Sequence, residues 1–140
     1  MASGQTALDL KDIWLFSSCT SSELKKIARA LHEAEVPEGR VLVEEGEMGA
    51  YLFIVVSGIA VVRRRGRTVA TLKPGDFFGE LSLLDRNPRS ASVECRTDIG
   101  VLLLSYRHFS KLLDSAPTIG KKLLSAMASR LRESESVAYL

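Results

Sequence analysis

The middle of the chain, from residue 40 to residue 105, alternates short apolar runs with polar breaks. The runs are rich in Val, Ile, Leu and Phe, and Gly, Pro or Asp residues separate them, which is typical of strands joined by tight turns. The pattern predicts strands at residues 41–44, 51–56, 59–64, 68–72, 90–95 and 101–104. Short strands at this spacing favour a small all-β barrel or a jelly roll.

Helical patterns flank this β region on both sides. Residues 8–32 are predicted to be helical, because Thr20 and Glu23 have the spacing of a capping box before an apolar repeat. Residues 37–39 (Pro-Glu-Gly) would end that segment. Residues 106–134 are predicted to be helical again, with Ser105 and Ser115 as N-caps. The whole chain, 1–140, is therefore expected to be one domain that is mainly β with flanking helices.

Composition narrows the class of protein further. The chain has 140 residues, 46% hydrophobic and 26% charged, which fits one globular domain. Its net charge of +2 is too small to indicate a polyanionic partner. No apolar run reaches the roughly 18 residues of a membrane span, and the first residues lack the features of a signal peptide. Cys19 and Cys95 lack metal-site spacing and are expected to be buried or half-buried thiols, so a cytoplasmic location without membrane attachment is expected.

The most informative motif is residues 78–84 (Phe-Gly-Glu-Leu-Ser-Leu-Leu), followed by residues 89–93 (Arg-Ser-Ala-Ser-Val). Gly79 allows close approach to the backbone, and the next residues can form a helical turn with free amides near Leu81 and Ser82. Such amides favour a phosphate, and Arg89 would add a forked permanent charge. Glu80 would repel a phosphate but accepts well from hydroxyls, so the set suggests a phosphorylated sugar.

Simpler interpretations of the same residues stay open. Glu80 could only favour a helix N-terminus, Arg89 could be a surface residue paired with it, and Gly79 could be a turn glycine.

The two motif segments resemble the phosphate-binding cassette of cyclic-nucleotide-binding domains, the type found in catabolite activator proteins and protein kinase A regulatory subunits. Further similarity lies in residues 37–39, 45–47, 51–55, 57–58 and 74–79, and it covers about residues 8–134. The resemblance implies a jelly-roll-like β-barrel with N-terminal helices, a short cassette helix and a C-terminal lid or hinge helix. It also implies that Glu80 accepts from the ribose 2′-hydroxyl and that Arg89 neutralises the cyclic phosphate. The remaining pocket lining it implies is Phe78, Gly79, Leu81, Ser82, Ser90 and Ala91.

The resemblance also suggests the ligand and the output. A serine at position 90 is more usual in cyclic AMP (cAMP) binders than in cyclic GMP (cGMP) binders, so cAMP is expected. Tyr139, Leu140 and Arg130 are candidates to cap the base. The domain is expected to relay a shape change to an unidentified effector protein, with a homodimer through the C-terminal helix as one arrangement and no direct DNA binding. Alternatives are a domain of this fold without ligand, a cGMP binder, and a regulatory fragment of a larger protein.

Two other features of the sequence bear on function. Residues 63–67 (Arg-Arg-Arg-Gly-Arg) form a basic hairpin tip that either contacts nucleic acid or anionic lipid, or is simply a solvated turn. His32 and His108 are the only histidines, and both fall in the predicted helices. A metal-dependent barrel enzyme needs several histidines and a carboxylate inside the barrel, so neither an enzyme nor a metal or cofactor site is expected.

Overall fold

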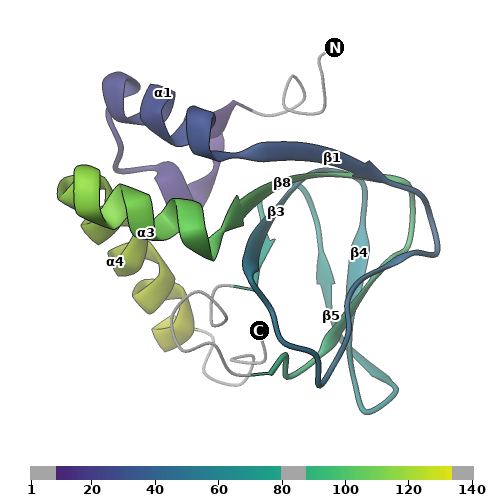
Figure 1. Cartoon of the computed structure of the whole chain (residues 1–140). Helices are drawn as coiled ribbons and strands as arrows, with labels where there is room; N and C mark the ends of the chain where they lie inside the picture. The colour runs from purple at the N-terminus through teal and green to yellow at the C-terminus, as the bar shows by residue number, and fades with distance from the viewer. Residues whose placement is uncertain (1–8, 80–87, 134–140) are drawn as a thin grey trace.

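Two four-stranded antiparallel sheets face each other, and helices cover the outer side of one of them (Figure 1). The computed structural model describes residues 9–79 and 88–133, with the backbone alone from 130 to 133. One sheet has the order β1-β8-β3-β6 and the other has the order β2-β7-β4-β5. The sheets are not closed into a single hydrogen-bonded barrel, so the jelly-roll-like alternative describes the fold.

The N-terminal segment forms short helices before the first strand. They are η2 (Leu10–Asp12), η3 (Trp14–Phe16) and α1 (Ser21–Ala30). The predicted capping box is confirmed, because Glu23 N–H donates to Thr20 Oγ1 at 3.2 Å and Thr20 N–H donates to Glu23 Oε1 at 2.8 Å. The α1 helix thus begins directly after Thr20, where the capping box predicts its start.

The prediction of helix as far as residue 32 is wrong at its end. α1 ends at Ala30, and β1 (His32–Val36) follows at once. His32 therefore lies on a strand, paired with Leu103 of β8 (Ile99–Ser105). Glu and Ala in this segment are good helix formers, but antiparallel pairing with β8 along the whole of β1 overrides that local preference.

The other strands lie close to their predicted positions. Their bounds are β2 (Val41–Val43), β3 (Tyr51–Ser57), β4 (Ala60–Arg64), β5 (Arg67–Leu72) and β7 (Ser92–Cys95). The strand predicted from residue 90 thus starts two residues later. A further short strand, β6 (Phe77–Phe78), was not predicted; it pairs with β3.

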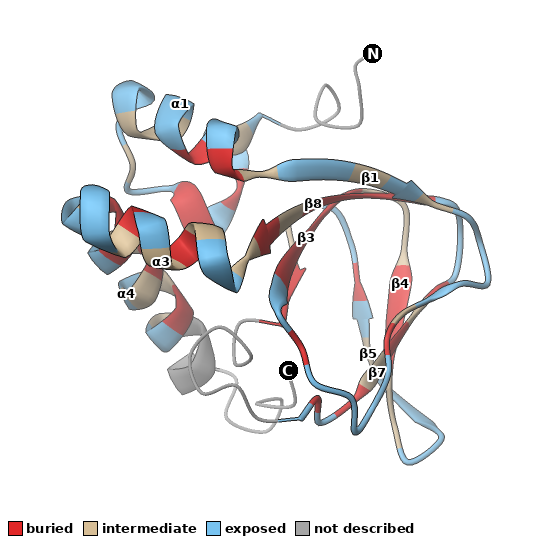
Figure 2. Ribbon diagram, in the orientation of Figure 1, coloured by how far each residue is buried: buried red, intermediate tan, exposed pale blue. Residues whose placement is uncertain are grey.

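Strand β3 is buried on both faces and separates two apolar clusters (Figure 2). Leu52, Ile54 and Val56 belong to the cluster between this sheet and the helices. Phe53 and Val55 belong to the cluster between the two sheets. Because successive side chains of a strand point to opposite faces, one strand contributes to both clusters. A displacement of β3 would therefore change the packing of both.

Two C-terminal helices complete the helical layer. They are α3 (Tyr106–Ser115) and α4 (Pro117–Glu133). Ser105 caps α3 as predicted, accepting from His108 N–H at 3.0 Å. Ser115 is not an N-cap: it ends α3, and its hydroxyl donates to the Lys111 carbonyl at 2.7 Å. No helix in residues 9–79 and 88–133 is long and apolar enough to cross a membrane.

Two local environments shift pKa values in the helical layer and the core. Lys122 of α4 donates to Glu23 of α1 at 2.7 Å, and this bond, helped by the Thr20 N–H, lowers the pKa of the Glu23 carboxyl. Cys19 is half-buried and Cys95 is buried, as predicted, and both are free thiols. Burial raises the pKa of each thiol, so both stay protonated at neutral pH.

The turn between β4 and β5 holds a residue in an unusual conformation. Arg65 has φ 54° and Gly66 has φ 79°, the pair of positive angles of a type I′ hairpin turn. Asn-Gly is the preferred pair for this turn, whereas a long side chain in the left-handed region is unfavourable. The Arg65 N–H donates to Glu45 Oε1 at 3.1 Å, and this bond does not depend on the Arg65 side chain.

We therefore expect Arg65→Asn to stabilise the fold by roughly 1 kcal/mol, because asparagine adopts positive φ more readily. The urea unfolding midpoint at high salt measures this with charge effects screened. The matched control is Arg67→Asn, which removes the same charge from a strand position. Equal midpoints for the two variants would contradict the prediction.

Candidate functional site

Arg89 is the only buried charged side chain among the described residues, with 5% of its surface exposed. It lies just before β7, next to Pro88, which forms an isolated bridge with Met48. Its guanidinium carries a permanent charge, and burying such a charge is costly unless partners surround it. The interpretation of Arg89 as a surface residue is therefore wrong.

Neighbouring segments fix both the backbone and the side chain of Arg89. Its N–H donates to the Glu47 carbonyl at 2.7 Å, and its carbonyl accepts from Gly46 N–H at 2.8 Å. Its Nη2 donates to the Tyr51 carbonyl at 3.0 Å, at the start of β3. Its Cζ lies 5.9 Å from the centre of the Phe53 ring, within cation–π range. The guanidinium is thus oriented before any ligand arrives.

Two glycines leave the space that the guanidinium occupies. A Cβ on Gly79 would lie 2.5 Å from Arg89 Nη1 and 2.6 Å from the Tyr51 carbonyl oxygen. A Cβ on Gly49 would overlap Arg89 Nε and Cζ. Gly79 also has φ +90°, a conformation that side chains disfavour. Any larger residue at either position would displace the arginine.

The position of Gly49 against Arg89 was not predicted from the sequence. The two residues are 40 positions apart, and the bridge between Met48 and Pro88, with the backbone hydrogen bonds of Arg89, brings their segments together. The one available signal was the glycine itself, in a loop between two strands.

The structure brings several of the predicted pocket residues together. Phe78 is fully buried and stacks on Phe53, with ring centres 4.8 Å apart and planes within 1°. Ala91 is also fully buried, in the same cluster between the sheets. Phe78, Gly79, Arg89 and Ala91 therefore border one region around Phe53. Ser90 lies exposed at a bend.

The other predicted site residues lie outside the described part of the chain. They are Glu80, Leu81, Ser82, Tyr139 and Leu140, together with the side chain of Arg130. Their assigned roles on the ribose, the phosphate and the base stay predictions.

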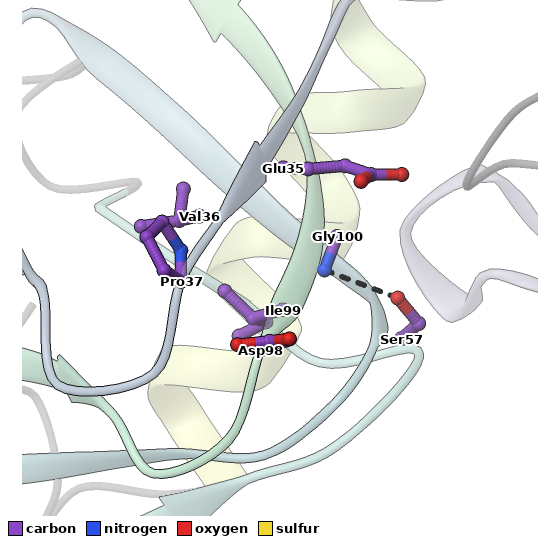
Figure 3. Close-up of a pocket in the computed structure, with 7 residues that line it drawn as sticks. All are labelled: Glu35, Val36, Pro37, Ser57, Asp98, Ile99 and Gly100. Carbon is purple, nitrogen blue, oxygen red and sulfur yellow. Dashed lines mark hydrogen bonds between the residues drawn. The ribbon is translucent and has the colours of Figure 1, made fainter.

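A separate cavity of about 400 Å³ lies at the other end of β3 (Figure 3). Ser57 in its wall accepts a hydrogen bond from Gly100 N–H at 3.0 Å. Tyr51, which holds Arg89, is six residues away along β3, or about 20 Å at the rise of a strand. This cavity is therefore distinct from the Arg89 region. Its lining is Glu35, Val36, Pro37, Ser57, Asp98, Ile99 and Gly100.

Curated relatives match most of this chain over a part of their own length. A cAMP-dependent protein kinase regulatory subunit from Yarrowia lipolytica is 41% identical over 106 residues, which are 74% of this chain and 28% of that protein. One from Debaryomyces hansenii is 40% identical over 113 residues, 80% of this chain and 25% of that protein. The chain thus spans about a quarter of the length of these relatives.

Solved structures agree on the fold. A cyclic nucleotide-binding domain from Methylobacillus flagellatus KT superimposes with a TM-score of 0.83 at 25% identity, covering 96% of this chain and 83% of that one. The catabolite activator protein of Thermus thermophilus gives a TM-score of 0.77 at 32% identity, covering 87% of this chain and 60% of that one. The resemblance inferred from the cassette motif is thus confirmed. Since the family model named cyclic nucleotide-binding domain also matches residues 33–116, more than half of the chain, this protein belongs to the cyclic nucleotide-binding domain family.

Proposed function

We propose that this chain binds cAMP, in preference to cGMP, and acts as a regulatory sensor domain. The observation that carries the proposal is the buried guanidinium of Arg89, held beside Gly49 and Gly79 in space that no side chain could share. A buried fixed charge of this kind is costly to maintain and suits the recognition of a small anion. In the family motif, Arg89 occupies the position of the phosphate-binding arginine.

The direction of the guanidinium supports a role in phosphate binding. Tyr51 and Phe53 hold it from the β3 side, through Nη2 and through the ring face respectively. Gly79 lies beside Nη1 and begins the cassette segment. A cyclic phosphate docking on cassette amides near Leu81 and Ser82 would meet this fork, and Glu80 would accept from the ribose 2′-hydroxyl. Tyr139, Leu140 or Arg130 would then cap the base.

Two observations favour cAMP as the ligand. The Yarrowia and Debaryomyces relatives are named as regulatory subunits of a cAMP-dependent kinase. Ser90 follows the arginine, and a serine at this position is more usual in cAMP binders than in cGMP binders. Because these relatives are named as kinase regulatory subunits, the effector that we propose is a protein kinase catalytic subunit. We propose that the two proteins meet in the cytoplasm.

A short chain of contacts connects Arg89 with the helical layer. The Tyr51 carbonyl accepts from Arg89, and the neighbouring Ala50 carbonyl accepts from Tyr106 N–H at 2.8 Å. Tyr106 is the first residue of α3, which packs on α4. Movement of Arg89 toward a bound phosphate would therefore pull on the loop that anchors α3. Differential affinity of the ligand for the two shapes supplies the free energy for the change.

Calorimetry with both nucleotides tests the function directly. We expect saturable heat with cAMP and a higher dissociation constant for cGMP, with a matching rise in melting temperature as ligand binds the folded state. If millimolar ligand produces no heat and no thermal shift, the chain is a domain of this fold that does not bind a nucleotide. Tighter binding of cGMP would overturn the choice of ligand alone.

Arg89→Ala should weaken cAMP binding by roughly 2–5 kcal/mol, because the phosphate would be left without its charged partner. Arg89→Lys keeps the charge but loses the fork, so we expect an intermediate loss. Calorimetry measures both variants, and melting curves without ligand show whether each is folded.

Arg96→Ala is the matched control, because Arg96 is an exposed arginine in the loop after β7. It should bind like the natural chain. A loss below tenfold for Arg89→Ala would mean that the phosphate is held by other groups.

The relay can be tested at one hydrogen bond. Tyr106→Pro removes the N–H donor to Ala50 while suiting the first position of α3, and the preceding Ser105 already has the extended conformation that proline requires. We expect cAMP to change hydrogen exchange of α3 and α4 amides in the natural chain, and to change it much less in this variant.

Tyr106→Ala is the control, since it removes the same ring but keeps the N–H. It should respond to cAMP like the natural chain. An undiminished response in Tyr106→Pro would exclude this route.

A further inference from the structure

The β4–β5 hairpin carries a basic groove that plays no part in the nucleotide site. The groove has a volume of about 710 Å³ and is lined by Arg64, Arg65, Arg67 and Val69. Figure 1 shows this hairpin on the side of the roll away from the helices α1, α3 and α4. A partner could therefore reach it without touching the helical layer.

The arginines of the groove concentrate positive charge at one place. Arg64 and Arg67 are directly opposite each other in the β4–β5 register, an arrangement that is destabilising for like charges. Arg63, on the same hairpin, is neutralised by Glu94 at 3.0 Å. Within the described residues, the side chains of Arg65 and Arg67 form no salt bridge. An anion in the groove could therefore pair with the side chains of Arg65 and Arg67.

The groove lies along an edge of the sheet. β5 is the last strand in the order β2-β7-β4-β5, so no described strand pairs with its outer side. The register shift opposite Arg63 leaves Val69 as an extra residue of β5, and 42% of its surface is exposed. An exposed edge with free backbone groups is a template for an added strand. The edge thus offers backbone pairing, an apolar contact and positive charge together.

The surroundings of the groove distinguish between anionic partners. Glu44, Glu45 and Glu47 are exposed in the adjacent loop, and Glu45 accepts from Arg65 N–H at the turn. A broad anionic surface, such as a membrane or a nucleic-acid duplex, would meet these carboxylates as well as the arginines. A second copy of the hairpin would bring arginines against arginines. A narrow anionic strand avoids both conflicts.

We propose that this edge binds an acidic peptide segment of a partner protein. The segment adds to β5 as an extended strand and directs its carboxylates to the groove arginines, with which arginine forms forked hydrogen bonds. The proposal does not depend on nucleotide binding.

A fluorescent peptide that alternates Glu and Val is a suitable probe, and anisotropy measures its binding to the full chain. We expect binding that weakens as salt rises, because the contacts are exposed ion pairs. The double variant Arg65→Asn with Arg67→Thr should lose about tenfold or more in affinity, since both residues suit their backbone positions while the charges are gone.

The double variant Arg40→Asn with Arg96→Thr is the matched control, because it removes two exposed arginines elsewhere. It should keep full affinity for the peptide. A cooperative melting transition of the hairpin variant, at a temperature no lower than that of the natural chain, would show that it is folded. Equal losses in the two double variants would mean that only net charge matters, which overturns the proposal.

Two further probes test the mode of binding. A peptide with proline at two consecutive central positions lacks an N–H donor on both sides of the strand, so it should bind much more weakly. Equal binding of that peptide would exclude strand addition. Hairpin-dependent binding of phosphatidylserine vesicles or duplex DNA, with no binding of the Glu-Val peptide, would assign the edge to another class of partner and overturn the proposal.

Discussion

The burial of one permanent charge is the constraint on which the site and its surroundings depend. Arg89 is accommodated because the Tyr51 carbonyl accepts from it, the Phe53 ring lies under it, and two glycines leave room for it. Tyr51 and Phe53 lie on β3, whereas Gly49 precedes that strand and Gly79 follows β6, so the partners of Arg89 come from segments that are distant in the sequence. The fold therefore holds an oriented, buried guanidinium that no local segment could build.

Strand β3 is the element that connects this charge with the rest of the molecule. It supplies the carbonyl and the ring that hold Arg89, it pairs with both β6 and β8, and its opposite face packs against the helices. Close-packed protein interiors respond to strain by discrete repacking rather than by smooth compression. A local shift at Tyr51 is thus felt in the helical layer as well as in the roll.

Features set by short-range chemistry could be predicted from the sequence. The capping box at Thr20, the cap at Ser105 and most of the strands depend on nearby residues, and they lie where the pattern indicated. β1 was missed because its Glu and Ala residues favour helix, and only pairing with β8 makes it a strand. β6 was missed because two residues are too few to show a period. The cassette motif identified Arg89, but its contact with Gly49 is long-range and invisible in one sequence.

The two glycines beside Arg89 have a consequence for sequence divergence within the family. Gly49 is required only while the arginine is there, because it is the guanidinium that a side chain at position 49 would strike. A lineage that lost the arginine would free position 49 to drift, whereas position 79 would still be limited by its backbone angle and by the Tyr51 carbonyl. The pair formed by residues 49 and 89 should therefore vary together across homologues. Their joint retention would distinguish domains that still bind a nucleotide from those that keep only the shape.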